Sequence, residues 1–138
     1  MTSLAGLLGS KVVSRASAED LGTLTGVVVD AAEHRVTAWQ VGKGRKARLV
    51  EHGHVTGLGS AAVVVDDEAS LREPADGELT HELVGHLVLS DAGFDLGPLV
   101  DVDVDAATGS ITSVLTEGTR ADGTTIRGLG SYALVLRA

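Results

Sequence analysis

The chain reads Leu8-Gly9-Ser10-Lys11-Val12-Val13-Ser14 near its start and Val84-Gly85-His86-Leu87-Val88-Leu89-Ser90 past its middle. Three further pairs of similar segments follow in the same order: 21–24 with 96–99, 27–32 with 102–107, and 58–63 with 129–134. A repeat that keeps its order along the chain indicates a duplicated structural unit. The repeat therefore predicts the architecture, although it does not predict the activity.

Short strands joined by tight turns are expected in both halves, because apolar residues alternate or come in short runs between the 18 glycines. A helical turn or two should follow Asp66 or Asp67 as a cap, with Pro74 ending it. Gly109 suits a hairpin turn with positive φ, whereas His34 at the matching place in the first half suits it less well. The predicted strands cover 11–15, 24–30, 35–42, 46–51 and 61–65, then 86–90, 98–105, 110–116, 124–127 and 132–136.

The length of 138 residues fits one ordinary domain or two very small ones. A unit of roughly 60 residues buries only about 60% of its unfolded surface and is marginal alone. The two units should therefore pack on each other or on a second copy of the chain. Aromatic residues make up only 2% of the sequence, so the core must consist of Val, Leu, Ile and Ala.

The composition excludes several classes of protein. There is no cysteine, so disulfides and thiolate metal sites cannot form. The N-terminus lacks the basic region and long apolar stretch of a signal peptide. No apolar run approaches the ~20 residues that span a bilayer. We therefore expect a soluble cytoplasmic protein with no membrane contact and no cofactor.

The net charge of −8 is shared unevenly between the halves. Residues 1–69 hold seven Lys/Arg and eight Asp/Glu, whereas residues 70–138 hold four and eleven. The second half should repel nucleic acid and anionic membranes. Any contact with a polyanion is therefore expected in the first half.

The order of these motifs resembles the PRC-barrel domain family, named for the photosynthetic reaction centre H subunit and seen in the ribosome maturation factor RimM. The motifs are the 7–14 run, Leu21-Gly22-x-Leu24, Val27-Val28-Val29-Asp30, a basic hairpin, and Val55-x-Gly57-Leu58-Gly59-x-Ala61. The resemblance covers 7–66 well and 83–136 less well. It implies two tandem small antiparallel β-barrels packed together, in an all-β fold that binds other macromolecules rather than catalysing a reaction. The implied divisions are a first repeat over 1–66, a linker over 67–82 and a second repeat over 83–138.

The first repeat departs from the family at His52-Gly53-His54, where members often carry a Pro-Trp-type segment. The second repeat has lost the basic hairpin, and 117–123 stands in its place. Binding through that hairpin would therefore not transfer to the second repeat.

The basic cluster of the chain is Gly42-Lys43-Gly44-Arg45-Lys46-Ala47-Arg48. It lacks the Gly-Lys-Ser/Thr ending of a phosphate-binding loop. On a hairpin it is either a solvated turn or a contact for an acidic protein or an RNA backbone. Trp39 on the adjoining strand is either a core residue or an interface anchor. The residues predicted to bind a partner are Trp39, Lys43, Arg45, Lys46 and Arg48.

Other polar motifs indicate metal chemistry only weakly. His52 and His54 would share one side of a strand, which suits a metal pair, a surface turn or a pH-sensitive contact. Residues 100–105 alternate Val and Asp, but Ala106 and Thr112 stand where a calcium loop needs Gly and Glu. His81-Glu82 followed by His86 places its second histidine one residue too far for a zinc-protease helix.

No arrangement of a nucleophile or an acid/base pair is evident, so no catalytic residue is named. The leading hypothesis is a non-catalytic adaptor or scaffold that binds a protein with an acidic surface, with self-association as a homodimer or as a pseudo-dimer within the chain. The alternatives are a module that binds RNA or ribosomal particles and, more remotely, a metal-binding sensor or enzyme. Neither the partner nor the choice between separate and strand-exchanged barrels follows from the sequence.

Overall fold

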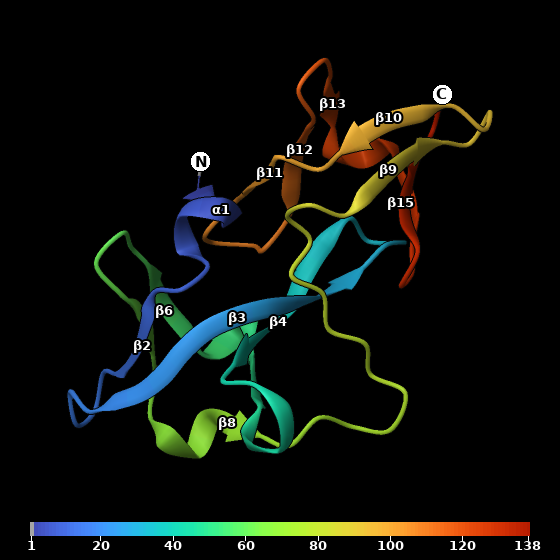
Figure 1. Cartoon of the computed structure of the whole chain (residues 1–138). Coiled ribbons are helices and arrows are strands. Elements are labelled where there is room, and N and C mark those ends of the chain that lie inside the picture. The colour runs from blue at the N-terminus through green and yellow to red at the C-terminus, as the bar shows by residue number, and fades with distance from the viewer. Residues whose placement is uncertain (1) are drawn as a thin grey trace.

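The computed structural model describes residues 2–138 and is mostly β, with 49% of residues in strands, 12% in helical turns and no long helix (Figure 1). The all-β prediction is confirmed. No helix in the described part of the chain is long and apolar enough to cross a bilayer. The first half contains β1 (Thr2–Ser3), α1 (Leu4–Leu7), β2 (Lys11–Ser14), β3 (Asp20–Asp30), β4 (Arg35–Val41), β5 (Arg48–Glu51), β6 (Val55–Leu58), β7 (Val63–Val65) and β8 (Leu71–Arg72).

The second half contains β9 (Leu87–Ser90), β10 (Asp95–Pro98), β11 (Asp101–Val104), β12 (Ile111–Leu115), β13 (Arg120–Asp122), β14 (Ile126–Leu129) and β15 (Ala133–Leu136). Four 3-10 turns punctuate the chain: η1 (Gly44–Lys46), η2 (His52–His54), η3 (Glu68–Ser70) and η4 (Gly123–Thr125). As predicted, the Asp67 side chain caps η3 by accepting a hydrogen bond from the backbone of Ser70, at 3.0 Å.

The two halves repeat one order of strand pairing. In the first half, β2 pairs antiparallel with β3 and parallel with β7, which pairs antiparallel with β6. In the second half, β9 pairs in the same way with β10 and β15, and β15 with β14. The sheets run β6-β7-β2-β3-β4-β5-β8, β10-β9-β15-β14 and β1-β11-β12-β13.

The expectation of closed, wholly antiparallel barrels needs correction. No closed barrel is found among residues 2–138, and each half contains one parallel pair. The strand predictions also missed β6, whose Gly57 interrupts the apolar run, and the separate strands β10 and β13. In the second half the chain leaves the sheet after Pro98, which has no N–H to donate, so the counterpart of the long strand β3 is split in two.

The segment that begins each half pairs with a strand of the other half. The strand β1 pairs with β11, and the Ser3 hydroxyl and the Ala5 N–H both donate to the Asp101 carboxylate, the latter at 2.8 Å. In return, His81 in the segment before β9 forms a two-way bridge with Val27 of β3, at 2.8 and 2.9 Å. Figure 1 shows α1 lying beside β11 in the upper half of the molecule.

The hairpin turns of the two halves also meet as equivalents. The Val36 N–H donates to the Gly109 carbonyl and the Ile111 N–H donates to the His34 carbonyl, both at 2.8 Å. Residues 34 and 36 of the first half correspond to residues 109 and 111 of the second, so the two hydrogen bonds are equivalent. The turn residues have the expected positive φ, with 56° at His34 and 80° at Gly109. A Cβ at Gly109 would come within 2.6 Å of the Val36 carbonyl oxygen, so the junction requires glycine there.

One apolar cluster runs through both halves, drawing on the strands, α1 and Leu83 of the linking segment. Trp39 on β4 is fully buried in this cluster. Its Nε1–H donates to Nδ1 of His52 at 3.0 Å, which leaves the His52 proton on Nε2 facing the Ala106 carbonyl, also 3.0 Å away. His52 is only 7% exposed and thus carries a hydrogen-bonded link from the core of the first half to the turn of the second.

A clamp formed by Arg72, Glu51 and Glu78 fixes the start of the linking segment. Arg72 donates to both oxygens of Glu78, at 2.8 and 2.7 Å, and to Glu51 at 2.7 Å. These hydrogen bonds, with one from the Ala75 N–H, lower the pKa of Glu78 to about 2. Because the folded pKa lies below the unfolded value, the pair stabilises the fold above about pH 4.5, and this stabilisation is lost as the pH falls toward 2.

We predict that His52→Ala lowers the free energy of unfolding by about 2–3 kcal/mol, because it leaves the buried Trp39 N–H without an acceptor. The control is His54→Ala, an exposed change on the same turn, which should cost less than about 0.5 kcal/mol. Urea unfolding followed by the fluorescence of the single tryptophan measures both. Equal costs for the two variants would contradict the link between the halves.

We predict that Glu78→Gln destabilises the protein at pH 6 by no more than about 1 kcal/mol, because solvent screens the pair. The difference from wild type should shrink as the pH is lowered from 5 toward 2, since wild-type Glu78 then loses its charge, first in the unfolded chain below about pH 4.5 and near pH 2 in the folded protein. Urea unfolding at several pH values measures this, with Asp76→Asn on the same segment as control. A difference that stays constant over this pH range would rule out the clamp as its source.

Candidate functional site

The basic loop, residues 42–48, is a rigid turn between two buried strands. Gly42 and Gly44 have φ of 80° and 64°, which side chains rarely adopt, so the glycines allow the chain to reverse here. The loop is anchored from below: the Gly42 N–H donates to Thr23, the Thr25 hydroxyl donates to the Gly42 carbonyl at 2.7 Å, and Ala47 is buried. The cations between these anchors are therefore held on the surface.

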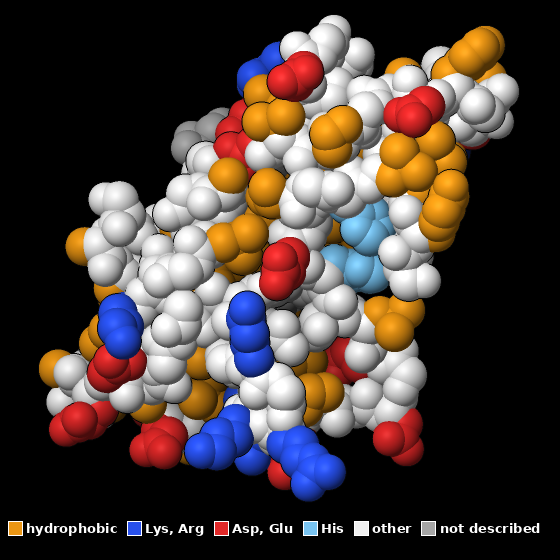
Figure 2. Space-filling view, viewed as in Figure 1, with side chains coloured by type: hydrophobic (Ala, Val, Ile, Leu, Met, Phe, Trp, Pro, Cys, Tyr) orange, Lys and Arg blue, Asp and Glu red, His pale blue; other side chains and the backbone are white. Residues whose placement is uncertain are grey.

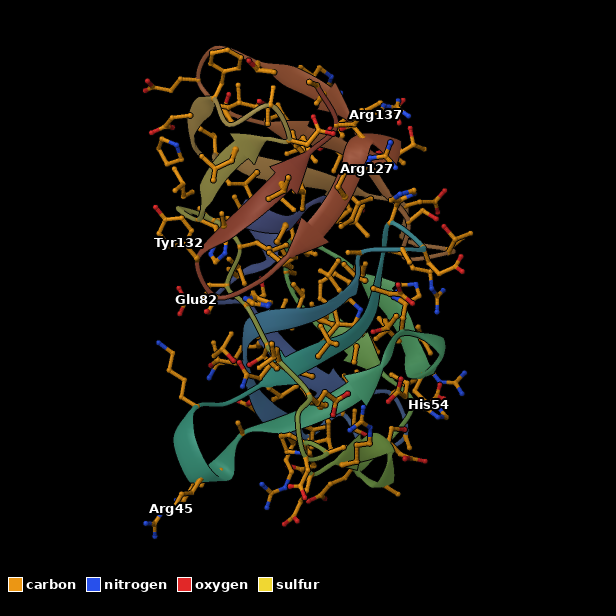
Figure 3. All side chains as sticks on the ribbon, turned by 90° about the vertical axis from the view of Figure 1, so that its right-hand side faces the viewer. Arg45, His54, Glu82, Arg127, Tyr132 and Arg137 are labelled. Carbon is orange, nitrogen blue, oxygen red and sulfur yellow. The ribbon has the colours of Figure 1, made fainter. Side chains whose placement is uncertain are left out.

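Lys43, Arg45 and Lys46 are exposed, and none of them takes part in an ion pair described within residues 2–138. Figure 2 shows Lys and Arg side chains gathered at the lower end of the molecule, and in Figure 3 Arg45 extends into solvent from the tip of the loop. Exposed, unpaired cations with fixed backbone produce a local positive potential on a protein of net charge −8.

Arg48 differs from the other three cations because its side chain is half-buried. Its guanidinium donates to the carbonyls of Arg45 and Ala47, at 3.3 and 3.0 Å, and lies 3.7 Å from the Glu73 carboxylate. Arg48 thus stabilises the loop itself, and only part of its charge faces solvent. The sequence placed the four cations together correctly but could not separate this structural role from the exposed ones.

Trp39 does not belong with the predicted partner-binding residues. Its side chain is 0% exposed and its N–H is used by His52, so it is a core residue and cannot touch a partner in this structure. The core alternative is therefore the right one, and β4 is buried on both faces here, with Ala38 and Trp39 both inaccessible. Contact through Lys43, Arg45, Lys46 and Arg48 stays a prediction.

His52 and His54 do not form a pair. They lie on the 3-10 turn η2, not on a strand, so His52 points into the core while His54 is exposed and 3.1 Å from Asp66. Both ring nitrogens of His52 are used in hydrogen bonds. Across residues 2–138, no group of three or more His, Asp or Glu side chains is arranged to hold a metal ion.

The aspartates of the 100–105 run serve separate structural purposes. Asp101 accepts from the exchanged N-terminal segment, and Asp103 pairs with Arg120 at 3.2 Å. Asp105 accepts from the Ala107 N–H at 2.9 Å within the hairpin turn. As the alternation suggested, Val102 and Val104 are buried.

His81 and His86 do come together, although no helix carries them. Their rings meet edge to face, with centroids 5.5 Å apart. Burial, and then the neighbouring His86, lower the pKa of His81. The two rings line a cavity of about 450 Å³, here called the histidine pocket, formed by residues 79–86 and Ser131. The sequence did not reveal this pocket, because Ser131 lies far along the chain and no motif predicts the positive φ of 65° at Leu83.

Comparison with known proteins gives one clear result. Residues 3–72 match the PRC-barrel domain, whereas 83–136, the weaker part of the resemblance, are not matched. No curated protein matches the chain significantly. The matched segment spans half of the 138 residues and includes every strand from β2 to β8. The chain therefore belongs to the PRC-barrel domain family.

Proposed function

We propose that the protein is a non-catalytic adaptor or scaffold, built from two tandem PRC-type units, which binds an acidic protein surface through the basic loop. The observation that carries the proposal is the loop itself: three cations without described partners stand on a backbone fixed by buried anchors. A cytoplasmic location is part of this proposal.

The second unit is proposed as a diverged copy of the first. The support is the repeated order of parallel and antiparallel pairing, together with the reciprocal bonds of Val36 and Ile111. Divergence by duplication explains why the first unit keeps the basic loop while the second carries most of the negative charge. Two such units in one chain offer two surfaces on one rigid body, which is what a scaffold requires.

The electrostatics favour a protein partner over RNA. Phosphate backbones bind clustered cations without sequence preference, but single-stranded RNA is normally held by exposed aromatic side chains as well. Trp39, the aromatic residue next to the loop, is buried. The acidic second half also opposes a long polyanion, whereas a compact acidic protein surface can meet the loop alone.

The test is capture of partners from native lysate, with and without nuclease, using wild type and a Lys43→Glu/Arg45→Glu/Lys46→Glu variant. Arg48 is left unchanged because it holds the loop. We expect the variant to retain about tenfold less of a protein partner that survives nuclease treatment, because opposite charges at a rim control association.

The matched control is Arg15→Glu/Arg127→Glu/Arg137→Glu, which changes the net charge by the same amount on exposed side chains elsewhere. Figure 3 shows Arg127 and Arg137 at the opposite end of the molecule from Arg45. The control should capture the partner as wild type does. Loss of capture on nuclease treatment would favour the RNA alternative, and equal loss in both variants would refute a contact specific to the basic loop.

A further inference from the structure

The second half carries an exposed aromatic side chain on a rigid turn. Phe94 is 69% exposed at the tip between β9 and β10. Its backbone is held on both sides by Ser90, with the Ser90 N–H donating to the Phe94 carbonyl at 2.9 Å and the Phe94 N–H donating to the Ser90 hydroxyl at 3.2 Å. A ring presented on fixed backbone loses little conformational entropy when it is buried by a partner.

The first half has a corresponding turn that is one residue longer and lacks the ring. There, the Ser14 N–H donates to the Glu19 carbonyl at 3.0 Å, so Glu19 is the counterpart of Phe94. Folding of the turn thus does not require an aromatic residue. An exposed phenyl ring at a position where the other copy has a carboxylate points to a role in contact rather than in stability.

The histidine pocket, in the same half as Phe94, differs from its counterpart in the first half. Its Ser131 corresponds to Ser60, which lines a smaller cavity of about 280 Å³ with Leu7, Leu58 and residues of the N-terminal segment. In the first half α1 occupies this place, whereas the equivalent 79–86 segment forms no helix and leaves about 450 Å³ open. The rim carries exposed apolar side chains among polar ones such as Thr80 and Glu82. Leu79, which lines the pocket, is 60% exposed, and Tyr132, the chain neighbour of Ser131, is 77% exposed.

The exposed Phe94 ring, here called the knob, and the histidine pocket lie at opposite ends of β9. His86 precedes the strand and Phe94 follows its far end, about 13 Å away for a four-residue strand. Phe94 therefore cannot reach the pocket of its own molecule. Asp91 and Asp95 lie close to Phe94 in the sequence, and Glu82 of the pocket is acidic as well. The opposite charge is on the basic loop, which lies with Arg45 on the same edge of the molecule as Glu82 in Figure 3. Figure 2 shows pale blue histidine side chains on this face, next to apolar side chains.

We propose that the partner of the histidine pocket is a second copy of this chain, whose Phe94 tip inserts between the histidine rings and the exposed Leu79 side chain of the rim. The contact is heterologous, since knob and pocket are different surfaces, so repetition adds molecules head to tail instead of closing a dimer. The inference rests on the proposed scaffold role, to which it adds self-assembly, but it does not depend on the partner of the basic loop.

The test is sedimentation of the purified protein over a range of concentrations. Two variants are compared with wild type: Phe94→Glu, which installs the residue that the first half uses on its own turn, and Ser131→Glu, which places a carboxylate in the pocket from an exposed position. We expect the mean mass of wild type to rise with concentration past that of a dimer, and each variant alone to associate at least about tenfold more weakly. Val100→Ser removes a different exposed apolar side chain and should associate as wild type does.

Mixing the two variants gives the decisive result. Phe94→Glu keeps an intact pocket and Ser131→Glu keeps an intact knob, so an equimolar mixture should form a complex of two molecules that grows no further. A wild type that stays monomeric, or variants that associate like wild type, would overturn the proposal, as would a mixture that forms no complex. Because only purified protein is used, such a failure would leave the lysate capture experiment, and the basic-loop proposal with it, unaffected.

Discussion

The fold depends on the backbone hydrogen bonds that cross between the two halves. A unit of this size without aromatic residues to spare cannot cover both the edge of its central strand and its own core. The edge of β11 is covered by β1, the edge of β3 by His81, and the hairpin tips satisfy each other through Val36 and Ile111. Separating the halves would expose all of these groups at once, so the chain has one core rather than two.

Much of this arrangement was predictable because the sequence repeats. The positions of most strands, the cap at Asp67 and the positive φ at Gly109 all follow from local rules about apolar runs, caps and turns. The exchange of leading segments was not predictable, since Thr2 and Ser3 are too few residues to show any period. The parallel pairing of β2 with β7 was also hidden, because strand order is a non-local property that alternation does not encode.

The same contrast separates the parts of the candidate surface. The basic loop is contiguous in sequence and its glycines mark the turn, so its cations could be named in advance. Trp39 could not be placed, because parity distinguishes inside from outside only where one face of a strand meets solvent. His52 was misjudged for a related reason: a short 3-10 turn, not a strand, separates it from His54 and turns the two rings in different directions.

The similarity of the two halves gives the molecule an internal comparison. Where both halves agree, as at the hairpin junction or at Ser14 and Ser90, the shared feature is what the fold needs. Where the halves differ, the fold does not require the difference, which is therefore open to function. The basic loop occurs in the first half, and the exposed ring and the open histidine pocket occur together in the second. Two departures in the same half are more simply explained by one contact between molecules than by two unrelated losses.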